Sequence, residues 1–434
     1  MLDAPRPPAT AAPVPAAGPA TSPARLGLCT AVVALGGLLF GFDTGVISGA
    51  LLFIRADFGL DSFEEGAVIS ALLLGAAVGA LGSGRPADRF GRKRVLVAVA
   101  ATFTLGLLAA VLAGGFWTLI AARAVLGLAV GGASTVVPLY LAEIAPPRLR
   151  GRLVTANQIL LTVGILVSYL INLWYAGSAD WRAMFAVGLV PSVAMLLGTL
   201  AIPESPEWLR GRTAARAPAG GALRAPGARA ALVIGVTLAA VQQFGGINSV
   251  IYYAPSIMAR AGLPAADSIT YSVVIGAVNV AATVAAVPLV DRAGRRPLLL
   301  FSLTGMAVSL VALGVVLGLP SGPVADVTAL VCMVTYVASF AVGLGPVFWI
   351  LAAELFPPEA RARGGAVCAL VNWAANFVVG QMFLPAADLL GESAVFWFFA
   401  AVSAGAVVFV ARTVPETRNR SLADVQRELA AARP

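Results

Sequence analysis

The sequence Asp-Arg-Phe-Gly-Arg-Lys at residues 88–93 returns as Asp-Arg-Ala-Gly-Arg-Arg at residues 291–296, 203 positions later. Two other motifs return in the same order, after 211 and 212 positions: Ala-Glu-Ile-Ala-Pro-Pro (142–147) as Ala-Glu-Leu-Phe-Pro-Pro (353–358), and Pro-Glu-Ser (203–205) as Pro-Glu-Thr (415–417). Three different motifs that recur in the same order at nearly the same spacing are not expected by chance. They predict a chain built from two parallel repeats.

The composition places these repeats in a membrane. Of the 434 residues, 59% are hydrophobic and 12% are charged, and the mean hydropathy is +0.90. A soluble globular protein carries about 25% charged residues and cannot bury so much apolar side chain. This excludes an ordinary cytosolic enzyme, a nucleic-acid-binding protein and a disordered protein. It favours a helical protein that crosses the lipid bilayer several times.

Twelve apolar segments are long enough to cross a bilayer. They are residues 26–54, 65–84, 95–113, 116–140, 153–176, 181–202, 230–258, 270–290, 298–318, 327–351, 364–386 and 393–414. The predicted organisation is a disordered cytoplasmic tail (1–25), a six-helix half (26–209), a cytoplasmic linker (210–229), a second six-helix half (230–415) and a cytoplasmic C-terminal tail (416–434). An even number of spans puts both termini on one side.

The basic residues indicate which side that is. If both tails and the even-numbered loops face the cytoplasm, that side holds all but four of the 29 basic residues. Arg55, Arg182 and Arg260 then lie outside, and Arg123 lies within the fourth span. Because cytoplasmic loops carry an excess of Lys and Arg, we expect both termini to be cytoplasmic in a multi-pass protein of the cell membrane.

Asp43 lies deep in the first span, where a charged side chain is costly and should have a partner. The candidate partner is Arg123, the one basic residue buried within a span. At ~1.5 Å per residue, Asp43 is roughly 16 Å and Arg123 roughly 10 Å below the outer ends of their spans, so their depths are compatible. Apolar surroundings favour the protonated form of a carboxylate, whereas a nearby cation favours the ionised form. The residues alone fit a proton-loading pair and a static ion pair equally well.

Several amides also lie within spans, at Gln158, Gln242, Gln243, Asn248, Asn279 and Asn372. Amides supply donors and acceptors without charge and so suit a neutral polyol, although they also join helices to each other in membrane bundles. Gly245-Gly246 interrupts the seventh span, and an interrupted helix at membrane depth typically lines a cavity.

Motifs along nearly the whole chain resemble the sugar porter family of the major facilitator superfamily. Besides the repeated motifs, these are Gly-Phe-Asp-Thr-Gly-Val-Ile-Ser-Gly-Ala (41–50), Pro-Glu-Ser-Pro-Glu-Trp-Leu (203–209), Gln-Gln-Phe-Gly-Gly-Ile-Asn (242–248), Gly-Pro-Val-Phe-Trp (345–349) and Asn-Trp-Ala-Ala-Asn-Phe (372–377). The chain departs from the family pattern at Glu207, at Asn419 and in its short linker.

The resemblance implies an all-α membrane protein with the major facilitator fold, twelve transmembrane helices in two pseudo-symmetric halves. It implies proton-coupled symport of a monosaccharide, glucose or a related hexose, by alternating access, with Asp43 and Arg123 coupling the proton. It also implies that the sugar is bound by Phe40, Gln158, Gln242, Gln243, Asn248, Asn279, Gly345, Trp349 and Asn372, and that Tyr252 closes the outer gate.

Charged residues at the inner ends of the spans suggest a cytoplasmic latch, in which opposite charges pair when that side is shut. Its predicted members are Asp88, Arg89, Arg92, Glu143, Arg150, Arg152, Glu204, Asp291, Arg292, Arg295, Arg296, Glu354, Arg361, Arg363 and Glu416. The alternative is that the arginines only set the topology. The matched carboxylates exceed what topology needs and favour the latch.

No nucleotide loop, catalytic triad or metal-ligand spacing is visible, there is no histidine, and the three cysteines lie in apolar runs. We therefore expect no enzyme activity, cofactor or metal. The expected partners are a sugar, a proton and the bilayer, with no nucleic acid, and a monomer suffices for this fold. A sugar uniporter and a proton symporter of a polyol such as inositol remain as alternatives, with a non-transporting sugar sensor as a remote one.

Overall fold

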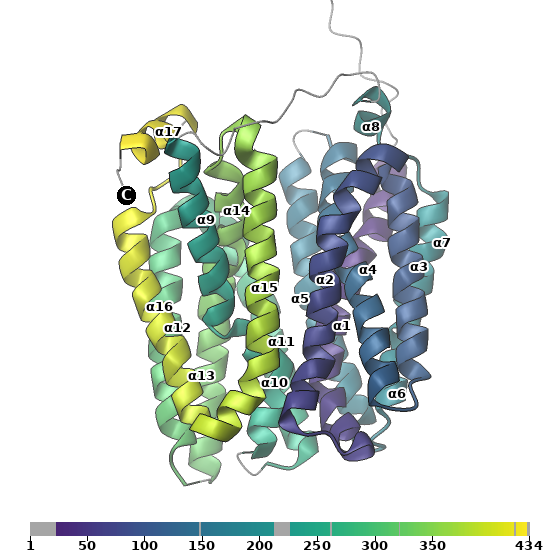
Figure 1. The fold of residues 1–434 in the computed structure, drawn as a ribbon, viewed down its shortest axis with the longest axis vertical. Helices are drawn as coiled ribbons and strands as arrows, with labels where there is room; N and C mark the ends of the chain where they lie inside the picture. The colour runs from purple at the N-terminus through teal and green to yellow at the C-terminus, as the bar shows by residue number, and fades with distance from the viewer. Residues whose placement is uncertain are drawn as a thin grey trace, which may run out of the picture.

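The computed structural model describes residues 23–146, 149–211, 226–260, 263–320, 322–420 and 422–431, and what it describes is almost entirely helical. Twelve helical segments in this part of the chain are long and apolar enough to cross a membrane. They overlap all twelve predicted spans. The first six and the last six of these segments form two halves that stand side by side (Figure 1).

The first half ends in a short helix that follows its sixth span. Its helices are α1 (Pro23–Phe58), α2 (Ser62–Phe90), α3 (Arg92–Val111), α4 (Phe116–Ile144), α5 (Arg150–Ala176), α6 (Trp181–Val187), α7 (Leu189–Ala201) and α8 (Pro206–Gly211). Helices α6 and α7 together form the sixth span.

The second half contains two broken spans. Its helices are α9 (Pro226–Phe244), α10 (Ile247–Arg260), α11 (Ala265–Ala293), α12 (Arg295–Leu317), α13 (Pro323–Val342), α14 (Leu344–Glu354), α15 (Pro358–Leu390), α16 (Glu392–Thr413) and α17 (Leu422–Ala431). Helices α9 and α10 form one span, and α13 and α14 form another.

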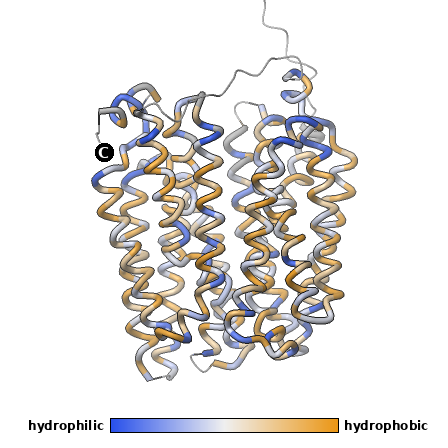
Figure 2. Tube along the Cα trace, in the orientation of Figure 1, coloured by the Kyte–Doolittle hydropathy of each residue, from blue (hydrophilic) through white to orange (hydrophobic). Residues whose placement is uncertain are grey.

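The distribution of apolar residues explains why these helices assemble in a bilayer. Hydrophobic residues run along every long helix, and hydrophilic residues gather mainly at the ends of the bundle (Figure 2). Large apolar side chains such as Trp174, Leu105 and Val308 are more than half exposed. Hydrocarbon solvates such a surface, so the helices bury apolar surface without needing a polar exterior.

Close contacts between α2 and α4 depend on glycines, at Gly75, Gly79, Gly127 and Gly131. A Cβ atom on Gly127 would lie 2.1 Å from the Leu72 carbonyl oxygen across the α2–α4 interface. No side chain fits there. Small residues bring α2 and α4 into backbone contact, which strengthens van der Waals packing in a membrane.

The two ends of the bundle differ in how the halves meet. We call the end that carries residues 88–93, 291–296 and α17 the terminal end, and the opposite end the distal end (Figure 1). Contacts between the halves join α2 to α15, α5 to α11 and α1 to α10. Among the described residues, the hydrogen bonds and ring contacts between halves all lie in the middle or at the distal end. The halves are therefore fastened together distally.

The predicted tails and linker lie only partly within the described residues. Residues 1–22 of the N-terminal tail and 212–225 of the linker fall outside them. The predicted C-terminal tail contains a helix, α17, which the sequence analysis did not anticipate. Its buried Val425 and Leu429 pack it against α9, and the Gln426 amide donates to the Leu355 carbonyl. The apolar spacing of Leu422, Val425 and Leu429 was the available signal.

Candidate functional site

Two broken helices lie beside each other in the second half. Helix α9 ends at Phe244 and α10 begins at Ile247, which confirms the predicted interruption at Gly245-Gly246. Gly246 has φ +88°, a conformation that favours glycine. The Tyr336 hydroxyl donates to the Gly245 carbonyl over 2.7 Å, which satisfies a backbone group freed by the break. Such breaks expose backbone dipoles inside the bundle, where a polar ligand can use them.

The second break separates α13 from α14 at Gly343, and no sequence signal predicted it. Here the backbone N–H of Leu344 donates to the Ser302 hydroxyl over 3.0 Å. The carbonyls of Leu344 and Gly345 both accept from the Gln242 amide, over 3.2 and 3.4 Å. Gln242, near the C-terminus of α9, therefore links the break between α9 and α10 to the break between α13 and α14 by hydrogen bonds.

Four of the predicted amides form one hydrogen-bonded chain. Asn372 on α15 donates over 2.8 Å to Gln242 and accepts over 3.1 Å from Gln243. Asn248 on α10 donates over 2.8 Å to the side-chain oxygen (Oε1) of Gln243. Asn372 also donates over 3.2 Å to the Ala239 carbonyl. We call Gln242, Gln243, Asn248 and Asn372 the amide network.

The other two predicted amides are not joined to this network by a described hydrogen bond. Asn279 is buried on α11, whereas Gln158 is exposed on α5 of the first half. The sequence places both at membrane depth, but the helix rotation that decides what each one faces depends on tertiary packing.

Phe40 and Trp349, the two aromatic residues among the predicted sugar ligands, make different ring contacts. Phe40 of α1 stacks on Trp373 of α15, with ring centroids 6.0 Å apart, so this contact joins the two halves. Trp373 is 8% exposed and is not among the predicted sugar ligands, although it follows Asn372 directly. Trp349 is 46% exposed and its described ring contact is with Phe348 on its own helix.

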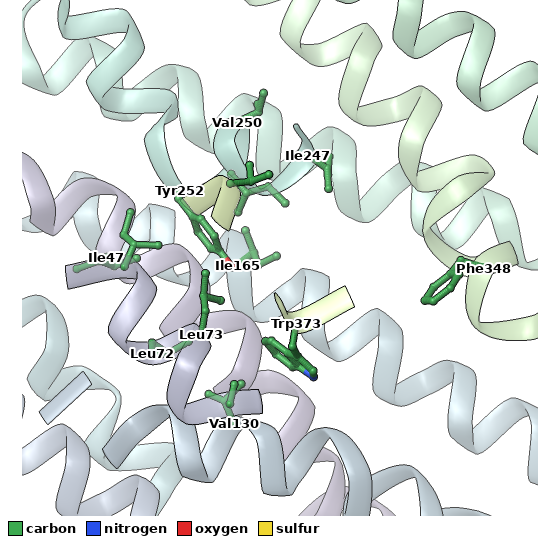
Figure 3. Packing of buried hydrophobic residues seen from close by; sticks show 14 of the residues in the cluster. Ile47, Leu72, Leu73, Val130, Ile165, Ile247, Val250, Tyr252, Phe348 and Trp373 are labelled. Atoms are coloured by element: carbon green, nitrogen blue, oxygen red, sulfur yellow. The ribbon is translucent and has the colours of Figure 1, made fainter. Parts of the chain in front are cut away.

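Tyr252, the predicted gate residue, is buried on α10 between the amide network and the first half. Asn376 of α15 donates to its hydroxyl over 3.4 Å. Figure 3 shows the Tyr252 side chain pointing toward Leu73 and Ile165 of the first half, with Trp373 nearby. It also lies within electrostatic range of Asp43 and Arg123.

Asp43 and Arg123 form the predicted pair. Nη1 of Arg123 lies 2.9 Å and 3.0 Å from the two carboxylate oxygens of Asp43, and each residue is 1% exposed. Nε of Arg123 donates to the Val68 carbonyl over 3.2 Å, which fixes the guanidinium between α1, α2 and α4. Each charge stabilises the other in this apolar interior, because removal of either residue would leave an uncompensated buried charge.

The structure also reveals a buried carboxylate that sequence reasoning missed. Glu65 of α2 is 2% exposed and lies 3.3 Å from Nε of Arg55. Nearby, Arg260 pairs with Asp388 over 2.6 Å at the distal end. Glu65 stands near the start of its span, where an acidic residue is unremarkable at a helix N-terminus, so its burial could not be predicted.

Some of the predicted latch residues form one cluster in each half at the terminal end. In the first half, Nη2 of Arg92 lies 2.9 Å from Glu143, and Nη1 lies 3.2 Å from Asp88. The Glu204 carboxylate accepts the backbone N–H groups of Arg92 and Lys93 over 2.9 and 3.1 Å. It thereby caps the N-terminus of α3, where a negative charge is favoured.

The second half repeats this arrangement. Nη2 of Arg295 lies 2.9 Å from Glu354. The Glu416 carboxylate accepts the backbone N–H groups of Arg295 and Arg296, each over 3.0 Å. Burial raises the pKa of Glu416, but these N–H donors and those of Arg418 and Thr417 stabilise the ionised form more and hold its pKa below the usual value. The sequence repeat is thus a repeat of structure.

Other predicted members stand apart from these clusters. Arg89 lies over the ring of Phe90, 5.1 Å from its centroid. The Arg296 side chain donates to the Ala411 carbonyl, and the backbone carbonyl of Arg292 accepts from the Arg418 side chain. Arg152, Arg361 and Arg363 make no ion pair with a described residue, and the side chains of Arg150 and Asp291 lie outside those described. Within the described part of the chain, the ion pairs at the terminal end join residues of the same half.

Replacing Gly91 with Ala should destabilise the first half by about 2 kcal/mol, because the residue has φ +104°. The new Cβ would also lie 2.1 Å from a Glu204 carboxylate oxygen, so the α3 cap would have to move. The measurement is thermal unfolding in detergent. Gly84→Ala is the matched control, since nothing lies within 4 Å of a Cβ there. Equal melting temperatures for the two variants would contradict this reading of the loop.

Comparisons with known proteins agree with this geometry. The chain matches the family described as "Sugar (and other) transporter" over residues 29–220 and 210–429. It is 39% identical over 425 residues to the glucose transporter GlcP of Staphylococcus epidermidis, covering 91% of this chain and 95% of that protein. It is 36% identical over 432 residues to the galactose-proton symporter of Escherichia coli, covering 92% and 93%.

A solved structure gives the same result. The inward-open xylose transporter XylE from Escherichia coli superimposes with a TM-score of 0.81 at 29% identity, covering 93% of this chain and 99% of that one. The fold, the matched family and the relatives all describe transporters. The chain therefore belongs to the sugar porter family of the major facilitator superfamily and is a multi-pass membrane protein that transports sugar.

Proposed function

We propose that the chain is a proton-coupled symporter of a monosaccharide, glucose or a related hexose, working by alternating access. The observation that carries this proposal is the amide network beside two broken helices, together with a buried carboxylate–guanidinium pair in the opposite half. The names of the relatives, a glucose transporter and a galactose-proton symporter among them, support both parts.

The amide network suits a neutral sugar. Its members already exchange hydrogen bonds with one another, so sugar hydroxyls can replace those bonds without leaving a buried charge. The carbonyl of Gly345 adds an acceptor, and Phe40 and Trp373 offer ring faces to the apolar C–H face of the sugar. Asn279, Gln158 and Trp349 join the site in this proposal when the halves close on the substrate.

Asp43 is the proposed proton carrier. As an anion it holds Arg123 between α1, α2 and α4, and a proton on Asp43 would remove the charge that holds the guanidinium there. The first half could then rearrange, with Tyr252 moving at the outer gate. Release of the proton on the other side would restore the pair and reset the carrier.

We propose that the terminal end faces the cytoplasm of the cell and the distal end faces outside. The excess of arginine at the terminal end supports this orientation. So does the likeness to an inward-open structure, because the described contacts between halves lie in the middle and at the distal end. The proposed boundaries of the halves are 26–209 and 230–415, in a chain that works as a monomer.

The latch proposal follows from the same orientation. In this conformation the charged clusters are closed within each half. Arg152, Arg361 and Arg363, which make no ion pair with a described residue, would then pair with the opposite half when the terminal end shuts. Each exposed pair contributes only about 0–1 kcal/mol, so several can favour the shut state without freezing it.

Adding the transported sugar to lightly buffered, de-energised cells that express the protein should make the medium more alkaline, because protons enter with the sugar. The measurement is external pH after adding glucose, galactose, xylose and inositol in turn, in parallel with entry of the labelled compounds. Cells carrying the empty vector are the control. Alkalinisation with inositol alone would identify a polyol symporter. Entry of labelled sugar without a pH change would contradict proton coupling and indicate a uniporter.

A further inference from the structure

One glutamine fastens the two halves together at the distal end. Gln381 lies on α15 in the second half and is 7% exposed. Its carbonyl oxygen accepts from the Ser70 hydroxyl of α2 over 2.5 Å, and its N–H₂ group donates to the Phe63 carbonyl over 2.9 Å. A single side chain of one half therefore makes hydrogen bonds with two points of α2 that lie about two turns apart in the other half.

Two glycines beside Gln381, Gly66 on α2 and Gly380 on α15, leave room for its side chain. A Cβ atom on Gly66 would lie 2.5 Å from the backbone oxygen of Gln381 and 3.0 Å from its Nε2. On the other side, a Cβ on Gly380 would lie 3.0 Å from Leu73 and 3.4 Å from Ile69. Glycine on each helix thus lets α2 and α15 approach closely enough for the amide to reach across.

These contacts cannot survive opening of the distal end. The proposed transport cycle requires the halves to separate there, and separation must pull Gln381 away from Ser70 and Phe63. Because the contacts are made by partners in different halves, they stabilise the distally closed conformation and contribute nothing to the open one. Each buried hydrogen bond is worth about a 2- to 12-fold preference, so the pair should favour closure about tenfold or more.

We infer that Gln381, with Ser70 and the Phe63 carbonyl, is a clasp that sets the balance between the distally closed and distally open states. Gln381 is a positioning residue in this role, since it lies apart from the amide network and from the Asp43–Arg123 pair. The inference rests on the proposed alternating access and adds to it the element that holds one of the two states.

The experiment introduces Ile69→Cys, at a residue that is 1% exposed beside the clasp, into a variant whose three native cysteines are alanine. Reaction with a polar maleimide in detergent then reports distal opening, whichever way the protein faces in the membrane. We expect Gln381→Ala to raise the labelling rate about tenfold and Ser70→Ala, which removes one hydrogen bond, about threefold. Gly66→Val, which blocks the approach of α15, should raise it at least as much as Gln381→Ala.

Met382→Ala is the matched control, because its side chain is 44% exposed on the same helix and should leave the rate unchanged. A labelling rate in Gln381→Ala equal to that of the parent would overturn the inference. If that variant does not remain monodisperse, Ser70→Ala decides alone, and an unchanged rate there overturns it equally. The labelling reaction needs neither sugar nor a proton gradient. Its result can therefore refute the clasp while symport is confirmed, or support the clasp while symport is refuted.

Discussion

Asp43→Asn should abolish accumulation of sugar against its gradient while leaving exchange of labelled for unlabelled sugar in place. The amide keeps the size of the carboxylate and can still accept from Arg123, but it cannot take up a proton. One proton moving through 100 mV supplies about 2.3 kcal/mol, enough for about 50-fold accumulation, so the ratio should fall from this order to 1. The measurement is the steady-state ratio of internal to external labelled sugar in energised cells.

Arg123 complicates this variant, because removing one partner of a buried pair leaves a charge uncompensated at a cost of about 3–5 kcal/mol. Asp43→Asn combined with Arg123→Gln removes both charges and tests the same point if the single variant does not fold. Glu65→Gln is the matched control, since it neutralises a second buried carboxylate of the first half and should keep accumulation. Full accumulation in Asp43→Asn would refute the proposed role of Asp43, and loss in Glu65→Gln alone would transfer that role to Glu65.

Asn372→Ala should weaken sugar binding about 100-fold, the largest effect expected from one residue of the network. Asn372 makes hydrogen bonds with Gln242, Gln243 and the Ala239 carbonyl, and truncation leaves all three without that partner. Each buried polar group left unpaired costs about 1–3 kcal/mol, and the chain that presents donors to the sugar is cut in the middle. The measurement is the Kd of the sugar identified by the alkalinisation experiment, by calorimetry on purified protein.

Two further variants make this result interpretable. Asn172→Ala removes another buried asparagine, whose amide donates to the Gly45 carbonyl within the first half, so it should alter stability without altering the Kd. Asn248→Ala removes the end of the chain and one hydrogen bond, so it should weaken binding less, about tenfold. A Kd in Asn372→Ala within twofold of the parent would mean that the network joins helices and does not bind sugar.

The parts of this fold that could be predicted are those with a local signal. Span length and composition give the twelve crossings, and the repeated motifs give two similar halves. The pairing of Arg92 with Glu143 and of Arg295 with Glu354 could be anticipated because both clusters lie at the same ends of their spans. The pairing of Asp43 with Arg123 could be predicted because a charged side chain buried in a membrane protein needs a partner of opposite charge.

The parts that could not be predicted depend on helix rotation and on contacts between halves. Nothing in the sequence says that Trp373 faces Phe40, or that Trp349 is 46% exposed, because both tryptophans lie at membrane depth in apolar segments. Gln381 carries no local signal either, since its partners Ser70 and Phe63 stand more than 300 positions earlier. The break at Gly343 is hidden in a segment whose other glycine, Gly345, is helical.

The stack between Phe40 and Trp373 gives the molecule an optical reporter of its own. The two rings belong to different halves, so the environment of the Trp373 indole must change whenever those halves move relative to each other. An indole that exchanges an aromatic neighbour for water emits at a longer wavelength. With the other six tryptophans replaced by phenylalanine, the emission maximum would follow the conformational cycle in real time, in the native bilayer and without any attached dye.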